Sequence, residues 1–196
     1  PGTDGALAMA MGHVILREFH IDRQAGYFGD YVRQYTDMPM LVRLDRKDGK
    51  LIPGRQLRAS DFKNALGETN NPEWKTVAFD ETSESVVVPH GSVGFRWGEK
   101  GKWNLEERDA DGRETNLRLT LENAHDEFVD VSFPYFGNID HDHFVSDAHP
   151  SVLERRVPVK KLQLADGEVL VATVFDLFVA NYGVDRGFGG SHVAKS

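Results

Sequence analysis

The chain has 196 residues, of which 23 are basic and 31 acidic, and its net charge of −8 disfavours a nucleic-acid-binding module, which needs clustered lysine and arginine. Hydrophobic residues make up 40% and charged residues 28% of the chain, as in a globular domain with a real core. Cysteine is absent, which excludes a disulfide framework, a thiolate metal site and a cysteine nucleophile on these residues.

The N-terminal segment predicts a buried helix. Thr3 or Asp4 can cap it, and a carboxylate there is favourable beside the positive end of the helix dipole. From Gly5 to Glu18 apolar side chains lie on nearly every face, which is typical of a helix surrounded by protein. The run is shorter than the about 20 apolar residues of a membrane-spanning helix. A start without methionine and a glycine-rich end favour a segment cut from a longer polypeptide.

The middle of the chain reads as a β-rich block. A second helix is predicted over 27–35, and Pro39 ends it. Short β-branched or alternating runs then follow to about residue 165, with at most one short helix near 60–66. The predicted strands are 41–44, 76–79, 86–88, 93–97, 117–121, 128–133 and 157–164. The turn signals between them are Asp48-Gly49, Pro53-Gly54, Asn70-Asn71-Pro72, His90-Gly91, Asp111-Gly112 and Asp166-Gly167.

The end of the chain returns to an α/β pattern, with a strand predicted over 169–175 and a helix that begins within 176–182. This order of elements predicts an α+β fold class, in which an α/β segment is interrupted by a β-rich insertion, rather than a free-standing β-sandwich. We therefore expect three regions: a helical region over 1–37, the insertion over 38–165, and a strand–helix return over 166–196.

Three local patterns could carry chemistry, and each has a simpler interpretation. His141 and His143 would share one face of an extended segment and could bind one metal ion, but a solvated acidic loop is favoured. Trp97 and Trp103 alternate with basic residues as in a single-strand-binding platform, yet the nearby glutamates favour a hairpin that packs both rings. The glycine-rich stretch 187–190 does not match a dinucleotide fingerprint and is interpreted as a flexible connector.

The strongest local signal is the turn Pro1-Gly2-Thr3-Asp4, which leads directly into the apolar helix. Backbone N–H groups at a helix N-terminus attract phosphate, and a carboxylate there can accept hydrogen bonds from the N1–H and N2–H₂ donors of guanine. Spacing alone favours an ordinary capped helix over a nucleotide site.

Longer motifs carry a family resemblance that covers essentially the whole chain. The opening PGTDGALAMAMGHV, residues 1–14, resembles the guanine-dinucleotide contact segment of the molybdopterin oxidoreductase superfamily. Five further stretches resemble the catalytic alpha subunit of membrane-bound respiratory nitrate reductase: YVRQYTDMPMLV at 31–42, NNPEWKTVAF at 70–79, GFRWGEKGKWNLE at 94–106, LQLADG at 162–167 and ANYG at 180–183.

The resemblance implies a fragment of a multidomain molybdoenzyme that reduces nitrate to nitrite at molybdenum held by two molybdopterin guanine dinucleotides. It implies that electrons come from quinol through iron–sulfur clusters, including a [4Fe-4S] cluster of the parent subunit. The implied partners are the remainder of the alpha subunit, an iron–sulfur beta subunit and a membrane cytochrome b gamma subunit, which hold the enzyme on the cytoplasmic face of the cell membrane. Residues 1–37 would then belong to the dinucleotide-binding region, with the insertion packed on the alpha or beta subunit.

Residue by residue, the resemblance transfers only a cofactor-binding role. Gly2 and Thr3 would contact the dinucleotide through their backbone, and Asp4 would pair with guanine or ribose. The family's molybdenum carboxylate and cluster ligands lie upstream of this segment, so we assign no catalytic and no metal-binding residue here. We expect the fragment alone to be inactive.

Two other hypotheses stay open at this point. The chain could be a stand-alone β-rich interaction module, which should begin with methionine and close its own core. It could also come from a related molybdoenzyme acting on another oxyanion, because substrate choice depends on residues around the metal that lie outside this sequence.

Overall fold

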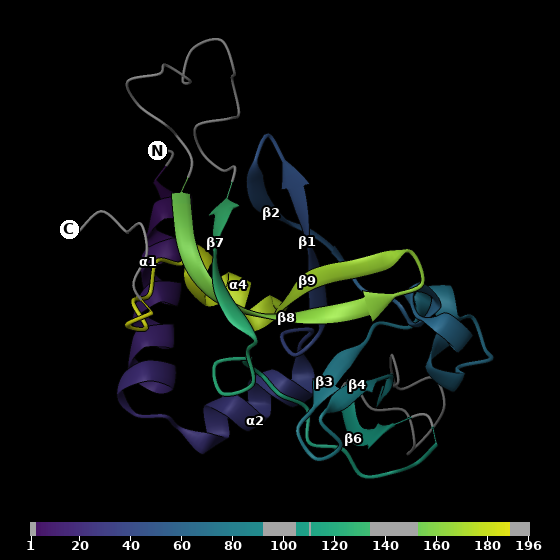
Figure 1. The fold of residues 1–196 in the computed structure, drawn as a ribbon. Helices are drawn as coiled ribbons and strands as arrows, with labels where there is room; N and C mark the ends of the chain where they lie inside the picture. Colours follow the sequence, from purple (N-terminus) through teal and green to yellow (C-terminus); the bar gives the residue numbers. More distant parts are fainter. Residues whose placement is uncertain (1–2, 92–104, 110, 134–152, 189–196) are drawn as a thin grey trace.

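The computed structural model describes residues 3–91, 105–109, 111–133 and 153–188. The chain opens with a helical arm: α1 (Asp4–Leu16) continues directly into the π-helix η1 (Arg17–Asp22), and α2 (Gly26–Tyr35) turns back from its end. In Figure 1, α1 lies to the left of the barrel strands and α2 runs below them. The prediction of a second helix over 27–35 is confirmed to within one residue.

Five strands form a closed barrel, in the order β1 (Leu41–Lys47), β2 (Lys50–Gln56), β7 (Glu127–Phe133), β8 (Leu153–Leu164) and β9 (Gly167–Thr173). Neighbouring strands pair antiparallel, except that β2 meets β7 in parallel at Leu51 and Val131. Asp48 and Gly49 both have positive φ, +51° and +79°, as a two-residue hairpin turn requires. The β1–β2 and β8–β9 hairpins confirm the turn signals at 48–49 and 166–167.

A smaller layer of short elements lies beside the barrel (Figure 1). It contains two two-stranded sheets, β3 (Ala78–Asp80) with β4 (Ser85–Val87) and β5 (Pro89–Gly91) with β6 (Leu105–Asp109). It also contains the 3-10 turns η2 (Ala59–Asp61), η3 (Lys63–Gly67) and η4 (Pro72–Trp74). The first two of these turns stand where one short helix was predicted near 60–66.

The last described helix, α4 (Val174–Asn181), follows β9 without a loop. Thr173 is its N-cap and accepts a hydrogen bond from the N–H of Asp176. One side of α4 packs on the barrel through Leu177 and Ala180, and the other packs on the helical arm through Phe175 and Val179. This helix therefore joins the arm to the barrel, and the predicted α+β fold class is confirmed.

Some local predictions are wrong. Residues 117–121 form no strand but a non-regular segment with one isolated bridge, Leu117 to Asp80, although Leu117 and Leu121 are buried as strand residues would be. Pro53-Gly54 is not a turn, because it lies inside β2 at a register irregularity opposite β1. His90-Gly91 lies within the short strand β5. The strand predicted over 93–97 lies outside the described residues.

The prediction of a fully buried first helix is also wrong for this chain. Leu16 is the one residue of α1 that is buried, while Leu7 and Met11 are 62% and 54% exposed. The helix is apolar all round, but the described residues supply only one of the surfaces that such a helix needs.

The proposed division at residues 37 and 165 stays a prediction. β9, which that division assigns to the last region, pairs with β8 and β1 of the insertion in one barrel. Within the part of the chain that the structure describes, no helix is long and apolar enough to cross a membrane.

Candidate functional site

The predicted cofactor-binding turn lies at the free end of α1. Gly2 lies outside the described residues. Thr3 is the N-cap residue, as predicted, but its side chain makes no capping hydrogen bond, and Asp4 is the first residue of the helix. Both residues are exposed. The amide groups of the first turn and the Asp4 carboxylate are therefore accessible to a ligand, and the positive end of the helix dipole favours an anionic one.

The other end of α1 is fixed to α4. His13 Nδ1 donates a 2.9 Å hydrogen bond to the carbonyl oxygen of Tyr182, and Gly12 lies against the Tyr182 ring with no room for a Cβ. Leu16 belongs to the cluster with Phe175. The helix is thus anchored near its C-terminal end, while the turn with Thr3 and Asp4 projects away from that anchor.

A cleft that sequence reasoning missed lies between the helical arm and the segment after α4. Its volume is about 900 Å³. The arm contributes one wall, and the loop 120–123 and residues 183–187 contribute the other. The ionisable side chains that line it include Arg17, His20, Asp30, Arg33, Glu122 and Arg186.

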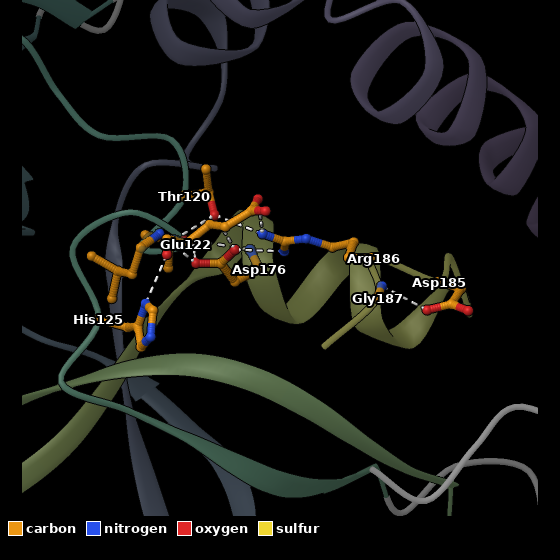
Figure 2. Close-up of polar contacts among 9 residues, drawn as sticks. Thr120, Glu122, His125, Asp176, Asp185, Arg186 and Gly187 are labelled. Carbon is orange, nitrogen blue, oxygen red and sulfur yellow. Dashed lines mark hydrogen bonds and ion pairs between the residues drawn. The ribbon is translucent and has the colours of Figure 1, made fainter. Parts of the chain in front are cut away.

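The wall of this cleft is fixed by a buried ion pair, Asp176 with Arg186 (Figure 2). Their atoms Oδ1 and Nη1 are 2.7 Å apart, and the two side chains are 0% and 5% exposed. Arg186 also donates to Thr120 Oγ1 at 2.8 Å and to Glu122 Oε2 at 3.1 Å. The guanidinium lies 4.5 Å from the ring centroid of Phe188.

Asp176 receives hydrogen bonds from three other groups besides the arginine. Thr120 Oγ1 donates at 2.6 Å, Thr173 Oγ1 at 2.9 Å and the backbone N–H of Leu121 at 2.9 Å. A carboxylate with its oxygens occupied in this way is a structural junction rather than a general base, because no lone pair is left for a substrate proton. The pair ties the 120–123 loop and Arg186, in the segment after α4, to the first turn of α4.

His20 is the titratable group of the arm that meets this junction. Its ring packs edge-on against Phe175 with centroids 4.7 Å apart. Burial and the nearby positive charge of Arg186 lower the pKa of His20 below its usual value, and the carboxylates of Glu122 and Asp176 oppose this only in part. The ring is therefore neutral at neutral pH.

The remaining sequence candidates have different outcomes. Gly187 has φ +75° and donates to Asp185 Oδ1, and Phe188 packs on Phe128 with ring centroids 4.7 Å apart, so the described part of the glycine-rich stretch is packed rather than a free connector. Trp97, Trp103, His141 and His143 lie outside the described residues. No cluster of three or more histidine or acidic side chains suited to a metal occurs among the residues that are described.

The fold and the candidate site thus define an α+β segment with an open, apolar helix whose exposed N-terminus suits an anionic ligand. No family model matches the chain. Over its whole length it is 57% identical to the respiratory nitrate reductase 1 alpha chain of Escherichia coli and, over 99% of its length, 58% identical to the nitrate reductase 2 alpha chain of that organism. The nitrate reductase alpha chain of Bacillus subtilis is 43% identical over 96% of the chain.

The resemblance predicted from the motifs is therefore confirmed, as a resemblance to one segment of respiratory nitrate reductase alpha chains. The chain spans 16% of each Escherichia coli relative and 14% of the Bacillus relative. A more distant relative is the perchlorate reductase alpha subunit of Dechloromonas aromatica, 32% identical over 59% of the chain.

Proposed function

We propose that this chain is a segment of the catalytic alpha subunit of a respiratory nitrate reductase, the enzyme that reduces nitrate to nitrite. The observation that carries the proposal is the 57–58% identity to two nitrate reductase alpha chains across essentially all 196 residues. Because the chain spans only 16% of those relatives, the reaction belongs to the longer polypeptide, and the isolated chain should be inactive.

The cofactor of the longer polypeptide is a molybdenum bis(molybdopterin guanine dinucleotide), for which Gly2, Thr3 and Asp4 would supply a binding turn. The described groups fit this ligand: the first-turn amides of α1 have no acceptor within the helix, the Thr3 side chain makes no capping hydrogen bond, and Asp4 is exposed. Amide donors suit phosphate oxygens, and a carboxylate suits the paired donors of guanine. The molybdenum centre supplies the oxygen-transfer chemistry, and this segment supplies binding and orientation.

The same proposal also assigns the source of the electrons and the cellular location of the full-length enzyme. Quinol would be oxidised at a membrane cytochrome b gamma subunit, with electrons passing through an iron–sulfur beta subunit and a [4Fe-4S] cluster of the alpha subunit. The ligands of these metal groups would lie outside this chain. The enzyme would sit peripherally on the cytoplasmic face of the cell membrane, and the β-rich insertion would pack on the rest of the alpha subunit or on the beta subunit.

A related molybdoenzyme acting on another oxyanion is the second candidate. The 32% identity to a perchlorate reductase alpha subunit favours it, although that match covers a smaller part of the chain at lower identity than the nitrate reductase matches. A stand-alone interaction module is disfavoured, because the relatives contain this sequence as one segment of a much longer chain.

The test is the substrate profile of the full-length subunit with its partners. We expect nitrite formation from nitrate with an artificial electron donor, and slower turnover of chlorate or perchlorate. The isolated chain should form no nitrite and should contain neither stoichiometric molybdenum nor iron by metal analysis. A full-length enzyme that reduces perchlorate but not nitrate would replace the proposal with the second candidate, and a metal-loaded isolated chain would contradict the assignment of the ligands to other segments.

A further inference from the structure

The outer face of α1 is apolar and exposed. Leu7, Met11, Val14 and Ile15 are 62%, 54%, 51% and 47% exposed. Their spacing of i, i+4, i+7 and i+8 places them on one face of a helix. The opposite face carries Gly12, His13 and Leu16, which contact α4, so this exposed stripe is a second apolar surface rather than the edge of the first.

This face begins at Leu7, in the N-terminal part of α1, and continues to Ile15 on the side of the helix that faces away from α4. In the described chain, the first hydrogen bond from α1 to another element is made by His13 to Tyr182. Asp4 precedes His13 by nine residues, which corresponds to about 13 Å of helix at 1.5 Å per residue. Because a helix of this length is marginal in water by itself, its N-terminal turns depend on packing along the helix to stay formed and to hold the binding turn in place.

Lipid is a poor partner for this face. With its 13 residues α1 is too short to span a bilayer, which takes about 20 residues. A helix that lies on a membrane surface needs a charged or polar face opposite its apolar one, whereas the side of α1 opposite the stripe packs against protein at Gly12 and Leu16.

We propose that the face formed by Leu7, Met11, Val14 and Ile15 docks on an apolar surface elsewhere in the same longer polypeptide, and that this docking positions Thr3 and Asp4. The relatives supply the occupant: 84% of each Escherichia coli alpha chain lies outside the segment that this chain matches, since the chain spans 16% of it. Covalent linkage gives that remainder a high effective concentration at the face. The proposal has two parts. The docking half, that this face is covered, rests on the exposure of the four side chains and on the length of the relatives outside the matched segment. The positioning half, that docking holds Thr3 and Asp4 in place, also rests on the proposed cofactor role.

The docking half can be tested on the wild-type full-length enzyme, because the face contains a methionine. Exposed methionine is oxidised to the sulfoxide more readily than buried methionine, and Met40, which is 3% exposed, is an internal control for burial. We expect Met11 in the native enzyme to be oxidised about as slowly as Met40 and at least about 10-fold more slowly than in the denatured enzyme, as quantified by peptide mass spectrometry.

Three outcomes would overturn the docking. Oxidation of Met11 at its denatured rate would leave the face uncovered. Protection that disappears on dilution would assign the face to a second copy, and protection that disappears when lipid is removed would assign it to the membrane. None of these measurements depends on the substrate, so the docking can fail while nitrate reduction stands, and the reverse.

The positioning half is tested by Met11→Asp in the full-length enzyme, with Leu66→Asp as the matched control. Leu66 is also an exposed apolar side chain, 37% exposed, but it lies in η3. We expect Met11→Asp to lower the molybdenum content per subunit by at least about 10-fold, corresponding to 1.4 kcal/mol of lost retention, and Leu66→Asp to leave it unchanged. Equal molybdenum contents in both variants would overturn the positioning role.

Discussion

Helix α1 has a higher proportion of apolar residues than the barrel strands, yet it buries fewer of them. Leu41, Val131 and Val159 of the barrel are fully buried, whereas Leu7 and Met11 of α1 are more than half exposed. The barrel strands pair with one another into a closed sheet, and each turns one face inward. The β-rich region therefore completes its own core, whereas the described residues leave one apolar face of α1 uncovered.

The largest effect is expected from removing the Asp176–Arg186 ion pair, which fixes the first turn of α4, the helix that packs on both the barrel and the helical arm. Asp176→Ala removes the buried carboxylate partner of the Arg186 guanidinium and leaves it the 40% exposed Glu122, which we expect to cost about 3–5 kcal/mol of unfolding free energy. Arg113→Ala is the control, because the Arg113 side chain is 75% exposed and its ion pairs among the described residues are with Asp109 and Asp111. Urea denaturation should show a change within about 0.5 kcal/mol for the control. Equal effects of both changes would mean that the junction does not support the fold.

The contrast in burial can also be measured by truncating one leucine in each region. Leu41→Ala removes a fully buried side chain from the barrel core and should destabilise the chain by about 2–5 kcal/mol. Leu7→Ala removes a side chain that is 62% exposed, and the unfolding free energy should change by less than about 0.5 kcal/mol. Thermal or urea unfolding of the two variants measures the contrast. A large loss from Leu7→Ala in the isolated chain would show that α1 is buried there after all.

The pH dependence of stability tests the contact between His20 of the helical arm and Phe175 of α4. Because the folded state lowers the pKa of His20 below 6.5, the unfolded state binds its proton more readily. Stability should therefore fall as the pH drops below about 6.5, with a slope of at most about 1.4 kcal/mol per pH unit for this one proton. Unfolding midpoints between pH 7 and 5 measure the slope, and His20→Phe should reduce it.

Three aspartate carboxylates should cause a second loss of stability at lower pH than that caused by His20. Asp61, Asp80 and Asp126 have pKa values lowered by hydrogen bonds or cations, so their stabilisation is present above pH 3.8 and is lost as the pH falls through their folded-state pKa values. A His20→Phe variant whose stability still falls steeply between pH 6.5 and 5 would contradict the assignment of the upper window to His20.

Local signals predicted the regular elements well. The Asp-Gly turns at 48–49 and 166–167, the amphipathic helix α2 and the helix after β9 are encoded by neighbouring residues, so the sequence alone locates them. The segment 117–121 has the composition of a strand, but its buried leucines pack without ladder pairing, and that choice depends on distant partners.

The candidate site was predictable only in part. Motif resemblance located Thr3 and Asp4, whose binding role stays a prediction. The cleft was not predicted, because it is formed by segments more than 50 residues apart in the sequence, as in the contacts of Thr120 with Asp176 and with Arg186. One local signal was available: Thr173 followed by Asp176 has the spacing of a helix cap and a first-turn acid. Nothing in the sequence pairs that acid with Arg186, since such pairing depends on the tertiary fold.

The proposed pairing of Asp4 with guanine is tested by the molybdenum content of the full-length enzyme carrying Asp4→Asn. If the Asp4 carboxylate pairs with guanine, the amide presents donors to donors, and losing a charge-assisted hydrogen bond of about 1.5–3 kcal/mol weakens dinucleotide retention about 10- to 150-fold. Molybdenum per subunit should fall while nitrate turnover per bound molybdenum stays near normal. Full molybdenum occupancy in Asp4→Asn would contradict the proposed pairing, because it would leave the Asp4 carboxylate with no role beyond its favourable charge in the first turn of α1.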